Sequence, residues 1–165
     1  MEVHNTTTEQ NTPQEQVSIL SRGLLQTIYR VEHILTRRVA SDGDNEITVT
    51  FQFPEYDRTL TTLGHVSEAQ MHPAIIEGAL CLIAHALREK TIQTDLSYGD
   101  FIEKLGCILY RGQTFTFREQ ISPNTDANLK FKIIEISRRG KFYIANISVE
   151  GFVSGTMKAV LPIIG

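Results

Sequence analysis

The chain has 165 residues, a net charge of −3 at pH 7, 41% hydrophobic residues and 21% charged residues. These values are ordinary for a folded globular protein, and the length suffices for one domain with a single core. The slightly negative charge excludes an overall basic field for nucleic acid or anionic lipid, and no apolar run reaches the length of a membrane span.

The N-terminal stretch MEVHNTTTEQNTPQEQ has neither the basic start nor the apolar core of a secretory signal. We expect residues 1–13 to be a disordered polar segment and residues 14–165 to form a single domain. The two cysteines, Cys81 and Cys107, form neither a disulfide framework nor a metal-binding pattern. The sequence therefore predicts a cytoplasmic protein without a metal.

The N-terminal half of the chain predicts a helix followed by strands. Apolar residues recur every three or four positions over residues 17–38, which predicts an amphipathic helix. SDGDN at 41–45 is a cluster of turn-forming residues. EITVTFQF at 46–53 alternates and predicts a strand that ends before Pro54, and LTTLGHV at 60–66 predicts a second strand.

The segment MHPAIIEGALCLIAHAL, residues 71–87, is apolar almost throughout. Pro73 suits the first turn of a helix, where its missing N–H costs nothing. Charged residues at 88–90 mark the return to water. A helix over 72–90 that is apolar on nearly all sides must be surrounded by protein.

The C-terminal part of the chain has the alternation typical of strands. The segments are CILYR, QTFTFREQIS, ANLKFKIIEISRR, KFYIANISVEG and FVSGTMKAVLP, with breaks at Arg111-Gly112, Ser122-Pro123-Asn124, Arg139-Gly140 and Gly151. These breaks predict hairpin turns and an antiparallel meander. The predicted fold class is α+β, a hot-dog fold: a curved antiparallel sheet wraps around the long central helix, and the N-terminal helix covers an open end or side.

The order of these elements resembles the hot-dog thioesterases and dehydratases. Over residues 17–162 the chain more closely resembles the FcoT-like thioesterase family. This resemblance rests on Gly64-His65, the A-x-x-E stretch that ends at Glu77 and precedes an apolar run with Cys81, DFIEKLGCILYRGQTF at 100–115 and SGTMKAVLP at 154–162.

The family resemblance implies a substrate class and an assembly. The substrate is an acyl thioester on coenzyme A or an acyl carrier protein, so coenzyme A or phosphopantetheine enters as part of the substrate and no separate cofactor is expected. Some family members are implicated in adding glycine to an α,β-unsaturated acyl thioester in lipopeptide and isonitrile pathways. The resemblance also implies a homodimer or a larger homo-oligomer, with no nucleic acid partner.

Glu77 is the leading catalytic candidate. It falls in the first two turns of the predicted helix, where the helix dipole stabilises its anion and burial raises its pKa. A carboxylate tuned in this way suits a general base, and free backbone N–H groups at the helix start can hold a developing oxyanion. The alternative is a structural glutamate that caps a turn or pairs with an arginine.

Two histidines compete to exchange a proton with Glu77 or the substrate. His72 lies just before the predicted helix, and His65 lies at the end of a predicted strand; a capping or solvent-facing role is the alternative for His72. Glu77, Cys81 and His85 are spaced by four and share one helix stripe. A Cys–His nucleophile pair is therefore conceivable, beside the interpretation of Cys81 as a small core residue.

The remaining predictions concern substrate binding. Ala74 and Gly78, next to Glu77 on the helix, are predicted to contact the substrate, and Tyr98 is predicted to line an acyl tunnel unless it belongs to the core. Arg138 and Arg139 either receive coenzyme A phosphates or an acidic carrier protein, or form a solvated turn. Hydrolysis, 3-hydroxyacyl dehydration and non-catalytic acyl binding all remain open on this scaffold.

Overall fold

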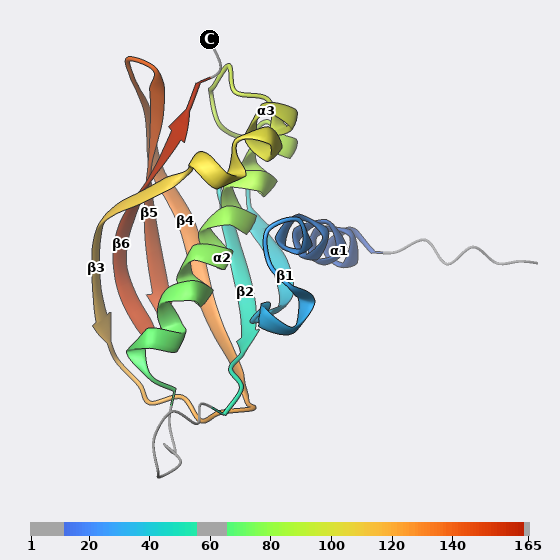
Figure 1. Ribbon diagram of the computed structural model, residues 1–165, viewed down its shortest axis with the longest axis vertical. Helices are drawn as coiled ribbons and strands as arrows, with labels where there is room; N and C mark the ends of the chain where they lie inside the picture. Colours follow the sequence, from blue (N-terminus) through green and yellow to red (C-terminus); the bar gives the residue numbers. More distant parts are fainter. Residues whose placement is uncertain (1–11, 56–65, 164–165) are drawn as a thin grey trace, which may run out of the picture.

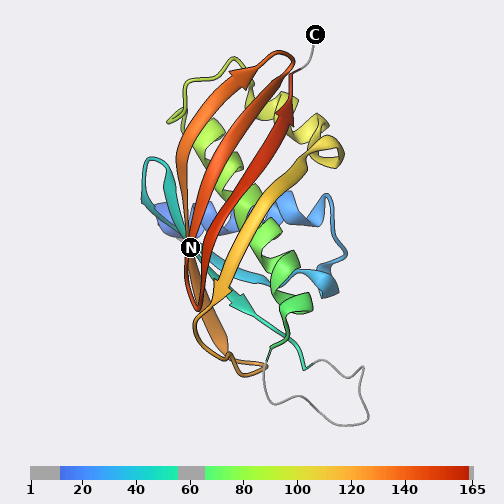
Figure 2. The same cartoon turned by 90° about the vertical axis from the view of Figure 1, so that its left-hand side faces the viewer.

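The structure is a computed structural model that describes residues 12–55 and 66–163. Its elements are α1 (Pro13–Gln26), a 3₁₀ turn (Val31–His33), β1 (Thr36–Gly43), β2 (Glu46–Gln52), α2 (Glu68–Arg88), α3 (Tyr98–Glu103), a second 3₁₀ turn (Leu105–Cys107), β3 (Leu109–Phe117), β4 (Asp126–Arg139), β5 (Phe142–Gly151) and β6 (Val153–Pro162). The strands form one antiparallel sheet in the order β1-β2-β4-β5-β6-β3. The sheet curves around α2, which lies along its concave face (Figures 1 and 2). The predicted α+β architecture is confirmed.

The core lies between α2 and the inner face of the sheet. Along β4 and β5 buried and exposed residues alternate, so that Phe131, Leu129, Ile147 and Val149 are fully buried. This is the period of two expected for a sheet with one face packed and one face toward water. The strand predicted at 46–53 is confirmed as β2, and the hairpin predicted at Arg139-Gly140 joins β4 to β5.

The predicted meander is only partly correct. Strands β4, β5 and β6 do pair in sequence order, but β3 pairs with β6 at the far edge of the sheet. The hairpin predicted at Arg111-Gly112 is wrong, because one strand, β3, continues through these residues with a register shift between Arg111 and Thr114. Gly112 lies in this bulge with a left-handed φ of 58°. Glycine adopts this conformation readily because it has no Cβ.

The N-terminal helix is shorter than predicted. It begins at Pro13 and ends at Gln26, whereas the second half of the predicted range 17–38 forms a turn and the start of β1. Of the apolar residues that extended the helical pattern, Ile28 and Val31 are exposed, whereas Ile34 is buried. Pairing with β2 overrides the helical pattern in this region, and neither glycine nor proline marks the helix end.

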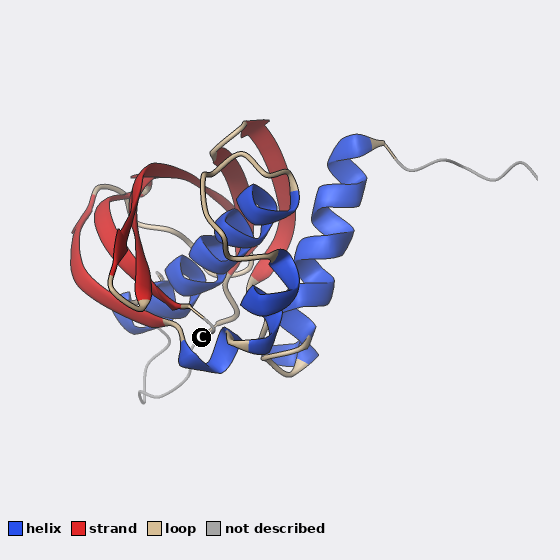
Figure 3. Ribbon diagram, turned by 90° about the horizontal axis from the view of Figure 1, so that it is seen from above, coloured by secondary structure: helices blue, strands red, loops and turns tan. Residues whose placement is uncertain are grey.

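Helix α1 covers the β1 edge of the sheet, in agreement with the expected covering role (Figures 1 and 3). The Ser18 hydroxyl accepts a hydrogen bond from the Val39 N–H at 2.8 Å and donates one to the Val39 carbonyl at 3.3 Å. Edge strands carry unpaired backbone groups that promote association with other chains. The helix therefore satisfies part of the β1 edge within the chain.

The central helix starts earlier than predicted. It runs from Glu68, preceded by Ser67, whose N–H donates to the Gln70 side chain at 3.0 Å in a capping box. Pro73 therefore lies inside α2 and not in its first turn. The carbonyl that loses its helical partner is that of Ala69, an exposed residue open to hydration.

Some predictions fall outside the described residues. They include His65, the Gly64-His65 motif, nearly all of the strand predicted at 60–66 and most of the segment 1–13. Over the ranges 12–55 and 66–163, no helix is long and apolar enough to cross a lipid bilayer.

Candidate functional site

Glu77 lies in the middle of α2 and is only 1% exposed. Its Oε2 accepts hydrogen bonds from the Leu35 N–H at 3.1 Å, the Thr36 N–H at 2.9 Å and the Thr36 hydroxyl at 2.8 Å. Its Oε1 accepts from the same Leu35 N–H, at 3.2 Å, so this one donor is shared between the two oxygens. The carboxylate fastens the start of β1 to the central helix, and its remaining capacity to accept hydrogen bonds lies on Oε1.

The electrostatics of Glu77 differ from the sequence-based expectation in one respect. Burial raises the pKa of the carboxyl, as expected, while hydrogen bonds from Thr36 and Leu35 and the nearby Arg37 act against that rise. The expected contribution of the helix start is wrong. Glu77 follows Glu68, the first residue of α2, by nine positions, so the free N–H groups of the helix start lie about two turns away.

The stripe of Glu77, Cys81 and His85 forms a polar seam between α2 and the N-terminal elements. Glu77 bonds to the start of β1, Cys81 interacts with the Ser21 hydroxyl of α1, and His85 Nε2 lies 3.1 Å from the Ser41 Oγ of β1. Burial raises the pKa of the Cys81 thiol to about 12. A thiol that stays protonated is a poor nucleophile, so the geometry favours the interpretation of Cys81 as a core residue.

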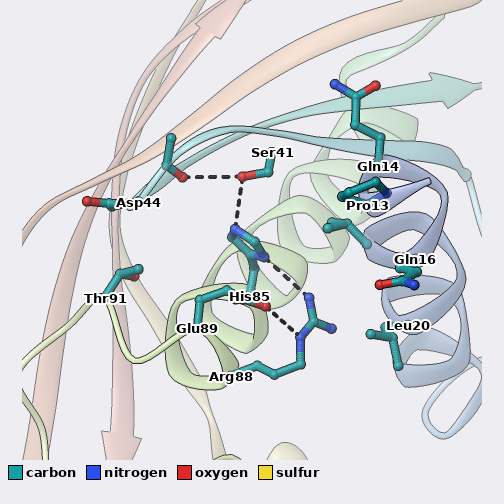
Figure 4. Close-up of a pocket in the computed structure, with 12 residues that line it drawn as sticks. Pro13, Gln14, Gln16, Leu20, Ser41, Asp44, His85, Arg88, Glu89 and Thr91 are labelled. Carbon is teal, nitrogen blue, oxygen red and sulfur yellow. Dashed lines mark hydrogen bonds and ion pairs between the residues drawn. The ribbon is translucent and has the colours of Figure 1, made fainter.

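His85 borders a pocket of about 620 Å³ between α1, the β1–β2 turn and the end of α2 (Figure 4). Its Nδ1 lies 3.4 Å from Nη2 of Arg88. Because a guanidinium only donates, Nδ1 accepts, and Nε2 carries the proton that it donates to Ser41. The Ser41 hydroxyl in turn donates to the Gly43 carbonyl at 3.4 Å. His85 is therefore arranged as a donor to Ser41 and not as the base of a Ser–His pair.

Two phenols lie within electrostatic range of the seam, Tyr29 of Glu77 and Cys81, and Tyr110 of Cys81. The pKa of Tyr29 is raised by burial, then by Glu77 and Cys81. The pKa of Tyr110, on β3, is raised by burial, then by Tyr29 and Cys81. Four ionisable groups from α2, β3 and the segment after α1 thus share one neighbourhood, and such clusters are enriched at functional sites.

Neither tyrosine was singled out from the sequence. The inward position of Tyr110 follows from the alternation in β3, but the turn predicted at Arg111-Gly112 divides this strand into two segments, CILYR and QTFTFREQIS, and leaves Tyr110 at the end of the first. Tyr29 lies in an irregular segment whose course depends on the bonds from Leu35 and Thr36 to Glu77, and no local pattern encodes these.

The other predicted helix residues do not converge on Glu77. His72 is exposed, and five positions along a helix turn a side chain by about 140° relative to Glu77. Ala74 and Gly78 are buried, and a Cβ on Gly78 would lie 2.2 Å from the Phe131 ring of β4. Gly78 thus allows the close approach of α2 to the sheet.

Tyr98 and Arg138 are each related to Asp95. Tyr98 lines a cleft of about 410 Å³ with Arg88, Lys90 and Asp95. Arg138 Nη1 lies 3.0 Å from Asp95 Oδ2, with both side chains more than half exposed. Solvent weakens such a pair, which leaves Arg138 free to exchange partners. Arg139 is exposed at the β4–β5 turn.

Metal ligation has no support among residues 12–55 and 66–163. Within these ranges, no group of three or more histidine, cysteine, aspartate or glutamate side chains is close enough to hold an ion.

Comparisons with known proteins give the fold. No family model matches the chain, and no curated protein matches its sequence. Thioesterase superfamily member 2 from Mus musculus is similar in structure, with a TM-score of 0.52 and 7% identity over 94% of this chain and 100% of that one. The HP0420 homologue from Helicobacter felis gives 0.51 and 13% over 93% of each chain.

A third similar structure is that of Cj0977, a sigma28-regulated virulence protein from Campylobacter jejuni. Its TM-score is 0.50, with 12% identity over 93% of this chain and 94% of that one. At such identities the likeness concerns the fold alone. Together with the sheet order and the central helix, these matches show that the chain has the hot-dog fold.

Proposed function

We propose that this protein hydrolyses acyl thioesters, with Glu77 as the general base. The observation that supports this most is the carboxylate of Glu77, buried in the middle of the central helix with Oε2 held by β1 and Oε1 nearly unoccupied. A base needs a fixed orientation and a free lone pair, and these contacts supply both. Burial raises the pKa of this carboxyl toward the range in which it can take and return a proton.

The proposed reaction conserves atoms and protons. Glu77 takes a proton from water, and the resulting hydroxide forms a bond to the thioester carbonyl carbon. The tetrahedral oxyanion then collapses, the C–S bond breaks, and the leaving thiolate receives the proton back from Glu77. The products are a carboxylic acid and the free thiol of the carrier.

The proposal also requires that a substrate reach the buried Glu77. With Glu77 1% exposed, an acyl thioester has to open a path to Oε1 when it binds. The segment between α1 and β1 is the natural element to move, because it approaches Glu77 through the Leu35 N–H and it includes exposed apolar residues such as Val31.

The finer assignment concerns the carrier and the family. We propose coenzyme A or an acyl carrier protein as the thiol carrier, with Arg138 and Arg139 as contacts for its phosphates or acidic surface. Arg138 bonds to the exposed Asp95 and to the carbonyl of Gly140 in the exposed β4–β5 turn, so its guanidinium stays accessible, which supports this role. The FcoT-like type, including addition of glycine to an unsaturated acyl thioester, rests on the sequence motifs around Glu77 and at 100–115.

The test is to incubate the protein with saturated, unsaturated and 3-hydroxy acyl thioesters of coenzyme A, with and without glycine. Mass spectrometry then identifies the products. We expect free acid and free coenzyme A from at least one substrate, and loss of this product in Glu77→Gln. Cys81→Ala is the matched control, because it changes the same helix stripe without removing the carboxylate. Turnover by Glu77→Gln at the wild-type rate would exclude Glu77 as the base.

A second candidate function is non-catalytic acyl binding. It is favoured by the structural role of Glu77, because three donors at the start of β1 already bond to its carboxylate. Under this alternative, the same panel gives no product, while acyl thioesters still raise the melting temperature of the protein.

A further inference from the structure

The phenol of Tyr110 is an unusual buried group. Among residues 12–55 and 66–163, its Oη and the Asn45 Oδ1 are the two buried side-chain oxygens without a hydrogen-bond partner. Leaving a buried hydroxyl unpaired costs free energy, and native proteins rarely do so without a reason. Asn45 lies in the β1–β2 turn, whereas Tyr110 lies on β3 and packs against the core.

The position of Tyr110 connects it to the proposed site. Tyr110 packs against the core from β3, the edge strand that lies opposite β1 in the sheet order. Cys81, which follows Glu77 by one helical turn, about 6 Å along the helix axis, contributes to the raised pKa of Tyr110. Glu77 and Cys81 contribute to the raised pKa of Tyr29, and both tyrosines pack against the core. The two phenols are therefore within electrostatic range of the stretch of α2 that carries Glu77 and Cys81.

We infer that the Tyr110 hydroxyl is a substrate-binding donor that bonds to the carbonyl oxygen of an acyl ligand in this neighbourhood. The inference deepens the proposed function and rests on it. An oxygen acceptor of the ligand would supply the partner that the hydroxyl lacks in the protein. A phenylalanine would fill the same space against the core without that cost, so packing alone does not explain the hydroxyl.

The protonation state of Tyr110 fits a donor. Burial and the neighbouring Tyr29 and Cys81 raise its pKa, so the phenol stays neutral at physiological pH. A neutral phenol donates to a carbonyl and stabilises negative charge that develops on its oxygen during attack by water. It is no base, which leaves that role to Glu77.

The experiment compares Tyr110→Phe with wild type in three measurements: melting temperature, thioester turnover and binding of a non-hydrolysable ketone analogue of an acyl-CoA that the protein hydrolyses. In this analogue a CH₂ group separates the sulfur from the carbonyl, so the carbonyl oxygen is kept. We expect an unchanged or higher melting temperature, because the variant removes an unpaired buried hydroxyl. We expect kcat/KM to fall about 100-fold, as when other enzymes lose one such donor. Binding of the analogue should weaken.

The matched control is Thr116→Val, which removes a hydroxyl from an exposed position of the same strand. It should keep wild-type turnover. Wild-type kcat/KM in Tyr110→Phe would overturn the inference while leaving the proposed function intact. Absence of both turnover and analogue binding in the wild-type protein would overturn the proposed function and this inference with it. If Tyr110→Phe lowered the melting temperature and Thr116→Val lost turnover as well, Tyr110 would have a structural role, and this would contradict the inference.

Discussion

Glu77 combines a structural and a proposed chemical role in one side chain. Its Oε2 satisfies two backbone N–H groups at the start of β1, which would otherwise be unpaired beside the core. A group that positions a strand is itself fixed in orientation, which is what a catalytic base requires. The structural role is thus compatible with the chemical one. Substitutions of Glu77 separate the two roles, because the structural role affects stability and the chemical role affects turnover.

Glu77→Ala should lower the free energy of unfolding by roughly 2–4 kcal/mol, because the Leu35 and Thr36 donors lose a charged acceptor in a buried site. Glu77→Gln should lose less, since its amide oxygen can still accept from Thr36. Urea denaturation followed by circular dichroism measures both. Equal stability of the alanine variant and wild type would show that the hydrogen bonds to β1 contribute nothing.

His85 gives a pH-dependent stability with a defined sign. Burial, followed by Arg88, lowers the pKa of His85 below its ordinary value of 6.5. The folded state therefore prefers neutral His85, and this stabilisation is fully present above pH 6.5 and is lost as the pH falls through the folded pKa. Protonation also removes the Nδ1 acceptor of Arg88.

The measurement is the free energy of unfolding of wild type and His85→Gln between pH 5 and 7.5. The wild-type advantage should shrink as the pH falls. The raised pKa of Glu77 has the opposite sign, favouring the folded state at low pH, but it is common to both proteins and cancels in the difference. A constant difference across this range would contradict the assigned protonation state of His85.

At the scale of elements, the sequence predicts what is locally periodic. The alternation in β2, β4 and β5 and the continuous apolar run of α2 identify those elements. The predictions that fail depend on contacts between distant segments: β1 forms by pairing with β2, and β3 bulges at Gly112 while it pairs with β6. The early start of α2 depends partly on Gln70, whose amide also donates to the Pro54 carbonyl.

Glycines in the two long helices offer a matched test of the packing. In Gly78→Ala the new methyl would meet the buried Phe131 ring at 2.2 Å, so we expect a loss of about 2 kcal/mol despite the better helix propensity. In Gly23→Ala, on the exposed side of α1, the methyl meets no atom within 4 Å, so we expect a gain of roughly 0.5–1 kcal/mol. Denaturant titrations measure both. A stabilised Gly78→Ala would contradict the close approach of α2 to β4.

At the scale of the whole molecule, the two sheet edges differ. Helix α1 covers β1, whereas β3 has exposed apolar residues in Leu109 and Phe117, at 50% and 42% exposure. An uncovered apolar edge strand is a place where a second chain can pair. We predict a homodimer formed through β3, and multi-angle light scattering should give twice the chain mass of 18.6 kDa.

Phe117→Lys should shift this dimer toward the monomer, because it places a charge on the pairing edge. Leu20→Lys, at an exposed apolar position of α1, is the control and should leave the dimer intact. A monomeric wild-type protein at working concentration would contradict the predicted assembly.

The candidate site was only partly accessible from sequence. Glu77 stood out because a single carboxylate interrupts an apolar helix, and its burial follows from that pattern alone. The sequence does not predict its hydrogen-bond partner Thr36, 41 positions away, or Tyr110, 33 positions away. These segments approach α2 only once the sheet is complete. His72 looked close in sequence but points to a different side of the helix.

The pH dependence of thioester hydrolysis tests the central claim most directly. If Glu77 is the base, kcat/KM should rise with pH, with a midpoint above 4.5, the ordinary pKa of the carboxyl, because burial raises it and only the ionised form accepts a proton. Glu77→Gln should lack this enzymatic activity while remaining folded. Hydrolysis by Glu77→Gln at the wild-type rate and with the wild-type pH profile would contradict the assignment.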